Sequence, residues 1–217
     1  LASCSANKQI NVYLIGDSTM ANKPVEENPE TGLGQMLHIF FFDNVQIENH
    51  ARNGRSSKSF IDEGRWRTVR NKLKTGDYVF IQFGHNDEKE YDSTRYAAPY
   101  KGYQANLKKF VTETRKKDGK PVLLTPIVRR RFDENGEFYG THGEYPAAVR
   151  QLARKLDVSL IDMTKSSREL IKSLGPEPSK DIYLWIEPGE YKTLPDGKED
   201  NTHFSVYGAK KMAKLAI

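Results

Sequence analysis

Residues 12–19 read VYLIGDST, an apolar and β-branched run that ends abruptly in a glycine, a carboxylate and two hydroxyls. A short continuous apolar segment of this kind is typical of a strand buried in a parallel sheet. Asp17, Ser18 and Thr19 follow it directly, so they are predicted to lie beyond the carboxyl end of that strand. Ligands of open α/β sheets bind at such ends. The stretch therefore indicates a strand that finishes either in an ordinary turn or in a nucleophile.

Strand and helix patterns alternate along the rest of the chain. Strands are expected over residues 10–15, 45–48, 78–83, 121–125 and 158–161. Helices are expected over residues 33–42, 66–73, 103–116, 145–156 and 165–174, and a last helix is expected to begin at Ser205 as its N-cap. This alternation predicts one α/β domain with a mostly parallel sheet of about five strands.

The composition is that of a globular chain with one well-buried core. The protein has 217 residues, of which 37% are hydrophobic and 29% charged, and its formal net charge is +5. No segment approaches the ~20 apolar residues that a membrane-spanning helix needs. The basic residues are dispersed apart from residues 129–131, a cluster too short to indicate nucleic-acid binding. We expect no nucleic-acid partner.

The single cysteine, Cys4, excludes an internal disulfide framework. Residues 1–4 read LASC and resemble the lipobox at which bacterial lipoproteins are cleaved and acylated, although a chance match is the alternative. A lipobox implies an exported bacterial protein, periplasmic or anchored to the outer membrane as a lipoprotein. Residues 1–9 would then form an N-terminal tether and residues 10–217 the folded domain.

Polar residues follow two further strands and precede the last helix. Residues 49–57 read NHARNGRSS after the second strand, and residues 84–87 read GHND after the third. Residues 200–205 read DNTHFS before the final helix. Strands of a parallel sheet end at one edge, so the first two segments are expected to lie beside Ser18, and a terminal loop can reach the same edge.

These segments together contain the groups that hydrolyse an ester through a serine nucleophile. The hydroxyl of Ser18 needs a base, which His203 can supply, and a carboxylate three residues earlier, Asp200, can orient the imidazole. Backbone N–H groups of Ser18 and Gly54 and the side-chain amide of Asn86 can stabilise the oxyanion. Each signal alone has an ordinary explanation in a turn, a helix cap or a surface histidine. Their order along the chain favours a catalytic site.

The same segments resemble the conserved blocks of the SGNH, or GDSL, hydrolase superfamily. The strings VYLIGDSTMA, NHARNGRSS, VFIQFGHND and DNTHFSVYGA are similar to those of its rhamnogalacturonan acetylesterase branch, over residues 12–209. The resemblance implies a flavodoxin-like three-layer α/β/α sandwich. It also implies Ser18 as nucleophile, His203 as base and Asp200 as its acid, with Ser18, Gly54 and Asn86 forming the oxyanion hole.

Three neighbouring residues are expected to have structural roles. Asp17 is expected to accept backbone amides and shape the turn around Ser18. Glu199 competes with Asp200 on composition alone, and the family spacing selects Asp200. His85 is expected to pack against or orient the loop before Asn86 rather than transfer protons.

The resemblance implies an acetylated pectic polysaccharide, rhamnogalacturonan, as substrate and partner. Galacturonate is anionic, so Arg55, Arg129, Arg130 and Arg131 are candidate contacts, with solvation or internal ion pairing as the equal alternative. Trp185 lies in a long segment, residues 175–198, and could stack on a sugar or pack in the core. That segment is expected to be functional or to be an insertion with small strands of its own.

Two other functions stay open at this point. An SGNH esterase could act on acetylated xylan or another small acyl ester, and a non-catalytic carbohydrate-binding lipoprotein could retain the fold with a broken triad. No cofactor is expected. No metal is expected either, because the sequence has no Cys/His cluster with ligand spacing. The sequence does not determine the oligomeric state.

Overall fold

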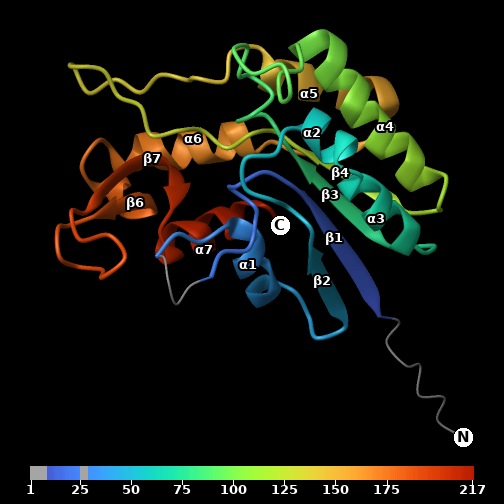
Figure 1. The fold of residues 1–217 in the computed structure, drawn as a ribbon, viewed down its shortest axis with the longest axis horizontal. Coiled ribbons are helices and arrows are strands. Elements are labelled where there is room, and N and C mark those ends of the chain that lie inside the picture. The colour runs from blue at the N-terminus through green and yellow to red at the C-terminus, as the bar shows by residue number, and fades with distance from the viewer. Residues whose placement is uncertain (1–8, 25–28) are drawn as a thin grey trace, which may run out of the picture.

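A five-stranded parallel sheet forms the centre of the computed structural model, which describes residues 9–24 and 29–217 (Figure 1). The strand order is β2-β1-β3-β4-β5, which is the order of flavodoxin-like sheets. The strands are β1 (Ile10–Gly16), β2 (Val45–Asn49), β3 (Tyr78–Gln82), β4 (Lys120–Leu124) and β5 (Ser159–Ile161). The predicted fold class and the five predicted strands are confirmed.

The register of the sheet brings the ends of three strands to one edge. Leu14 of β1 lies opposite Asn49, the last residue of β2, and Gly16 lies opposite Gln82, the last residue of β3. Beyond β2, the backbone N–H of Arg52 still donates to the carbonyl of Gly16 at 3.0 Å. The segments that follow β1, β2 and β3 therefore start side by side.

Alternate residues of β1 pack into two separate cores, one on each face of the sheet. Val12 and Leu14 point to one face, and Tyr13 and Ile15 to the other, as the pleat of a strand requires. The first face is covered by α1 (Leu33–Met36), α6 (Met163–Leu174) and α7 (Val206–Leu215) (Figure 1). The second is covered by α2 (Ser57–Asp62), α3 (Arg65–Lys72), α4 (Gln104–Arg115) and α5 (Tyr145–Leu156). The three-layer sandwich is confirmed.

Some helical elements differ from the prediction. The helix expected over residues 33–42 is two short pieces, α1 and the 3-10 helix η1 (Leu37–Phe40), and it ends before residue 42 because the backbone becomes extended at Phe41. Helix α2 was not predicted. Its N-cap is Ser56, whose hydroxyl accepts from the backbone N–H of Ser59 at 3.1 Å while Ser59 Oγ accepts in return. A π-helix, η2 (Pro99–Tyr103), leads into α4, and a 3-10 helix, η3 (Pro178–Ile182), follows α6.

A two-stranded antiparallel hairpin lies outside the main sheet. It consists of β6 (Tyr183–Ile186) and β7 (Lys198–Phe204), so the long segment does contain a small strand of its own, as predicted. Residues 200–204, expected as a loop, belong to β7. The loop prediction was wrong because β6 supplies the backbone partner. Tyr183 pairs with Phe204 but Leu184 pairs with Asp200, so residues 201–203 bulge out of the ladder.

The predicted lipobox and tether concern the N-terminal end of the chain. Cys4 and the expected tether up to residue 8 lie outside the described residues. Among the helices that the structure does describe, none has the length and apolarity to cross a membrane.

Candidate active site

A buried turn at the end of β1 positions the nucleophile candidate, Ser18. The preceding Gly16 has no room for a side chain, since a Cβ there would lie 2.6 Å from the carbonyl oxygen of Gln82. Asp17 is fully buried, and its Oδ1 accepts from the backbone N–H of Thr19 at 3.0 Å and from its hydroxyl at 2.9 Å. These bonds close the turn around Ser18. They confirm the structural role predicted for Asp17.

The hairpin β6–β7 brings the predicted base and acid to Ser18. His203 Nε2 lies 2.9 Å from Ser18 Oγ, and His203 Nδ1 lies 2.8 Å from Asp200 Oδ2. Asp200 Oδ1 accepts from the backbone N–H groups of Thr202 and His203, at 2.8 and 3.0 Å, and so holds the bulge in shape. Glu199 lies opposite Trp185 in the hairpin, so Asp200 is the carboxylate that orients the imidazole.

Electrostatics fix the direction of these hydrogen bonds. Partial burial raises the pKa of Asp200, but the hydrogen bonds and the attraction of His203 outweigh it and hold the pKa well below its usual range. An ionised Asp200 accepts the proton of His203 Nδ1. Nε2 is then the unprotonated nitrogen that faces the hydroxyl of Ser18, as a general base requires.

Three hydrogen-bond donors belong to residues that line one pocket, Ser18 among them. The backbone N–H groups of Ser18 and Gly54 donate to no other described residue, and Gly54 has a φ of +72°, which strongly favours glycine. Asn86 Nδ2 donates to the carbonyl of Arg55 at 3.2 Å, which orients its second N–H. Ser18, Gly54 and Asn86 all line the same pocket. They can form the oxyanion hole that the sequence predicts.

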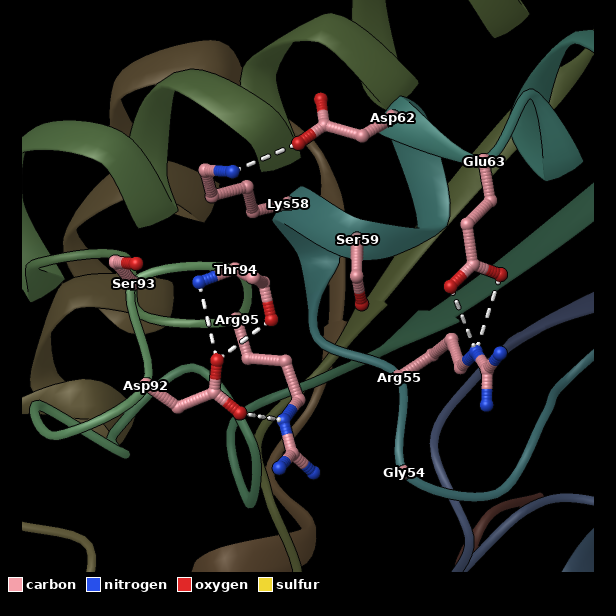
Figure 2. Close-up of a pocket in the computed structure, with 10 residues that line it drawn as sticks. All are labelled: Gly54, Arg55, Lys58, Ser59, Asp62, Glu63, Asp92, Ser93, Thr94 and Arg95. Carbon is pink, nitrogen blue, oxygen red and sulfur yellow. Dashed lines mark hydrogen bonds and ion pairs between the residues drawn. The ribbon is translucent and has the colours of Figure 1, made fainter.

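This active-site pocket has a volume of about 410 Å³, and the described residues that line it include no aliphatic or aromatic hydrocarbon side chain. Its lining residues are Ser18, Glu30, Asn53, Gly54, His85, Asn86, Lys89, Arg129, Thr202 and His203. A second pocket, of about 660 Å³, adjoins it at Gly54 and is shown in Figure 2. We call it the neighbouring pocket. It is lined by Gly54, Arg55, Lys58, Ser59, Asp62, Glu63, Asp92, Ser93, Thr94 and Arg95.

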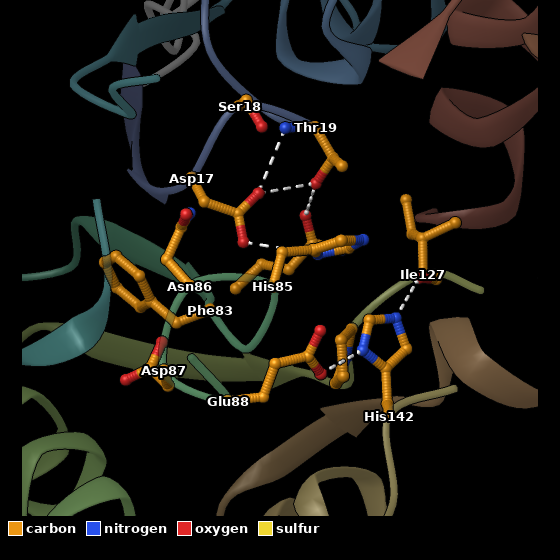
Figure 3. A network of polar contacts seen from close by, with 12 residues as sticks. Asp17, Ser18, Thr19, Phe83, His85, Asn86, Asp87, Glu88, Ile127 and His142 are labelled. Carbon is orange, nitrogen blue, oxygen red and sulfur yellow. Dashed lines mark hydrogen bonds and ion pairs between the residues drawn. The ribbon is translucent and has the colours of Figure 1, made fainter. Parts of the chain in front are cut away.

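A second histidine–carboxylate pair lies beneath Ser18 (Figure 3). His85 Nδ1 is 3.4 Å from Asp17 Oδ2, and the His85 ring packs edge-on against His142. Burial lowers the pKa of His85 to about 4, against the attraction of Asp17. Burial raises the pKa of Asp17, but His85 and Thr19 outweigh it and lower that pKa to about 2. His85 therefore stays neutral near pH 7, and its expected role in packing against or orienting the loop before Asn86 stays a prediction.

The proposed substrate arginines have different surroundings. Arg129 lines the active-site pocket, where its guanidinium is bound by Glu88 and, at 3.0 Å, by the hydroxyl of Thr141. Arg55 lines the neighbouring pocket, and its Nε donates to both oxygens of Glu63 at 3.0 and 3.1 Å.

Arg130 and Trp185 line neither pocket, and their role as substrate contacts stays a prediction. The guanidinium of Arg130 lies over the Trp185 ring at 5.0 Å, and Lys180 lies 4.4 Å from that ring. Both side chains bind Asn201, at 3.0 Å from Arg130 Nη1 and 3.1 Å from Trp185 Nε1. The Arg130 guanidinium and the Trp185 ring thus contact each other and support the bulge of β7 through Asn201. Arg131 is exposed and also lines neither pocket.

Sequence reasoning missed two charged residues of the active-site pocket, Glu30 and Lys89. Glu30 Oε1 lies 3.9 Å from His203 Nε2 and forms a buried ion pair with Lys23. Lys89 is three residues after Asn86 in a charged run, EKE, that resembles a solvated surface. The sequence signal that could have identified Lys89 is its position three residues after Asn86, a predicted donor of the oxyanion hole.

No cluster of three or more His, Cys, Asp or Glu side chains suited to a metal ion occurs within residues 9–24 and 29–217. The expectation that the reaction needs no metal or cofactor stays a prediction.

The nucleophile, base, acid and oxyanion donors define a serine ester hydrolase. The sequence profile of the GDSL-like lipase/acylhydrolase family matches residues 14–211. The chain belongs to this family. It is 45% identical, over 96% of its length and 88% of the relative, to the rhamnogalacturonan acetylesterase RhgT of Bacillus subtilis.

Two solved structures have the same fold. The Bacillus subtilis protein YxiM superposes with a TM-score of 0.82 at 25% identity, over 96% of this chain and 55% of that chain. A catalytic mutant of Axe2, an acetylxylan esterase from Geobacillus stearothermophilus, superposes with a TM-score of 0.64 at 20% identity, over 95% and 91% of the two chains. The second likeness concerns the fold alone.

Proposed function

We propose that this protein removes acetyl groups from acetylated rhamnogalacturonan through an acetyl-enzyme intermediate on Ser18. The observation that carries the proposal is the continuous chain of contacts from Ser18 Oγ through His203 to Asp200, at 2.9 and 2.8 Å. The similarity to an enzyme of that name, over almost the whole chain, supports the substrate class. A non-catalytic carbohydrate-binding protein would need a broken triad, and this triad is assembled.

The reaction follows from the geometry. Ser18 Oγ attacks the acetyl carbonyl while His203 Nε2 takes the hydroxyl proton, and Asp200 stabilises the imidazolium that forms. The N–H groups of Ser18, Gly54 and Asn86 stabilise the oxyanion. His203 then protonates the departing sugar oxygen. A water molecule, deprotonated by His203, attacks the acetyl-enzyme and releases acetate.

The lining of the active-site pocket favours a short acyl group and a polar alcohol. A long acyl chain needs an apolar wall, because its methylene groups gain about 0.8 kcal/mol each only when they leave water. This pocket offers hydroxyl, amide, imidazole and charged groups instead. Such groups suit an acetyl ester carried by a sugar, whose hydroxyls need hydrogen-bond partners.

The test is acetate release from a panel of acetylated polysaccharides. Wild-type protein is expected to release acetate fastest from acetylated rhamnogalacturonan, and the Ser18→Ala variant is expected to release none above the uncatalysed rate while keeping its circular dichroism spectrum. Faster release from acetylated xylan would transfer the proposal to that substrate. Activity of Ser18→Ala within tenfold of wild type would refute the nucleophile.

We also propose that Cys4 carries a lipid and tethers the protein to a bacterial membrane, either in the periplasm or at the outer membrane. The four residues LASC support this proposal. Mass spectrometry of the native protein is expected to find a diacylglyceryl group on Cys4. An unmodified Cys4 thiol would refute the tether.

A further inference from the structure

Lys89 is a cation in the wall of the active-site pocket that has no counter-ion within the part of the chain that the structure describes. Its side chain is half-buried and, among the described residues, makes neither an ion pair nor a hydrogen bond. Burial lowers the pKa of Lys89, and the positive charges of Arg95 and Arg129 lower it further; the carboxylates of Glu88 and Asp92 oppose this but do not outweigh it. A half-buried ammonium held near two guanidinium groups gains energy when an anion binds beside it.

The other charges of this pocket are compensated within the protein. Arg129 is bound by Glu88, Glu30 forms an ion pair with Lys23, and His203 is bound by Asp200. Of the described charges that line this pocket, that of Lys89 is therefore the one left for a ligand to neutralise. It lies on the loop that also carries Asn86, so an anion bound there lies close to the oxyanion hole.

Arg95 extends this positive charge to the border of the neighbouring pocket. Its Nε binds Asp92 (Figure 2), and both Nη groups have no partner among the described residues. Arg95 Nη1 lies 3.8 Å from the position that a Cβ on Gly54 would occupy. Because Gly54 lines both pockets, the guanidinium edge lies where they meet.

The neighbouring pocket itself is balanced in charge. Its three cations each bind an anion of the same wall: Lys58 binds Asp62 at 2.8 Å, Arg55 binds Glu63 at 3.0 Å, and Arg95 binds Asp92. Paired donors and acceptors of this kind suit the hydroxyls of a neutral sugar. Among the described residues, the charges that line the neighbouring pocket thus pair with one another, whereas Lys89 in the active-site pocket is paired with no anion.

We propose that Lys89 and the Nη edge of Arg95 bind a uronate carboxylate of the polysaccharide while its acetyl ester reaches Ser18, and that the chain continues over Gly54 into the neighbouring pocket. This inference rests on the proposed function and assigns the residues that select an anionic sugar chain. Guanidinium and ammonium donors to a carboxylate make charge-assisted hydrogen bonds, which are stronger than neutral ones.

The experiment compares Lys89→Met, Lys89→Arg and the control Lys108→Met, which removes the same charge from an exposed position on α4. Substrates are acetylated rhamnogalacturonan oligosaccharides and neutral acetylated xylo-oligosaccharides. Lys89→Met is expected to raise KM for the anionic substrate about tenfold, the loss of one charge-assisted hydrogen bond. The KM for the neutral substrate is expected to change less than twofold, and Lys89→Arg is expected to restore most of the loss.

A KM for the anionic substrate that Lys89→Met leaves within twofold of wild type, or that Lys108→Met raises equally, would overturn the inference. An equal rise for both substrates would overturn it too. A second assay separates this inference from the proposed function. De-esterified galacturonan oligosaccharides are used to inhibit the hydrolysis of 4-nitrophenyl acetate, and the inhibition constants of wild type and Lys89→Met are compared. If wild type releases no acetate from acetylated rhamnogalacturonan, the proposed function is refuted, but a higher inhibition constant in Lys89→Met still supports the anion site.

Discussion

Two histidine–carboxylate pairs flank Ser18, and they have opposite roles. The pair formed by His203 and Asp200 lies at the pocket mouth, with the His203 side chain 27% exposed and its Nε2 2.9 Å from Ser18 Oγ. The pair formed by His85 and Asp17 lies under the turn, with the His85 side chain 5% exposed. The same two residue types perform chemistry in one place and hold the backbone in the other.

Solvent access explains the difference. A general base must take a proton from the nucleophile and later deliver it to the leaving group, so its free nitrogen has to face both. His203 meets this condition from the bulge of β7. His85 is held against Asp17 and His142, and burial lowers its pKa to about 4, so it stays neutral. We expect substitutions in the first pair to change rates and those in the second to change stability.

The largest effect is expected for His203→Ala, which removes the base. The loss in kcat is expected to be on the order of 10⁶-fold, as for other serine hydrolases that lose the triad histidine. The melting temperature is expected to stay close to that of wild type, because the side chain is partly exposed and supports no core. A loss in kcat below tenfold would show that another group accepts the proton.

Asp200→Asn is expected to lower kcat about 10⁴-fold, because an amide favours the wrong tautomer of the imidazole. Glu199→Gln is the matched control, since it removes a charge from the adjacent residue of the same strand. Its kcat is expected to lie within about twofold of wild type. Equal losses in the two variants would mean that net charge, and not the contact with Nδ1, determines the rate.

Asp17→Asn is expected to act mainly on stability. It removes the buried charge that lies 3.4 Å from His85 Nδ1, a nitrogen without a hydrogen-bond partner among the described residues, and the loss of that attraction is expected to cost about 1–3 kcal/mol. Urea denaturation is expected to report this loss, while kcat is expected to fall at least tenfold less than in Asp200→Asn. A variant with wild-type stability and an Asp200→Asn-like rate would assign Asp17 to the catalytic machinery.

The smallest effect is expected on how steeply the free energy of unfolding changes with pH. Folding lowers the pKa of His85 from 6.5 to about 4, so between these values the unfolded chain binds a proton that the folded chain does not. This contribution to stability is complete above pH 6.5 and is lost as pH falls toward 4, at up to about 1.4 kcal/mol per pH unit. In the His85→Asn variant, the free energy of unfolding, measured by urea denaturation, is expected to change less steeply with pH between 6.5 and 4.5 than in wild type. Equal steepness in the two proteins would contradict a buried neutral His85.

Most of the sheet and of the catalytic centre could be predicted because their signals are local. Each strand is a short apolar run, and each catalytic residue directly follows or precedes such an element. The parallel sheet places the ends of β1, β2 and β3 together, so the residues after these strands could be grouped. The contact between Ser18 and His203 spans 185 positions, and it was predicted from the residue types that follow β1 and precede the last helix.

Features that depend on partners distant in sequence were not predictable in the same way. Strand β7 reads KEDNTHF, which has no apolar alternation, and it forms because β6 pairs with it. The use of Arg130 and Trp185 to hold Asn201 depends on the same hairpin. Lys89 resembled a surface lysine because charge compensation by neighbours is a property of the folded structure.

The bulged hairpin has a consequence for how the protein can lose activity. The base and its acid belong to a two-stranded unit outside the five-stranded sheet, and isolated pairs of strands are marginally stable by themselves. Fraying of that unit would separate the imidazole from its serine while both hydrophobic layers remain packed. Inactivation is then a local opening event, with a lower free energy than global unfolding.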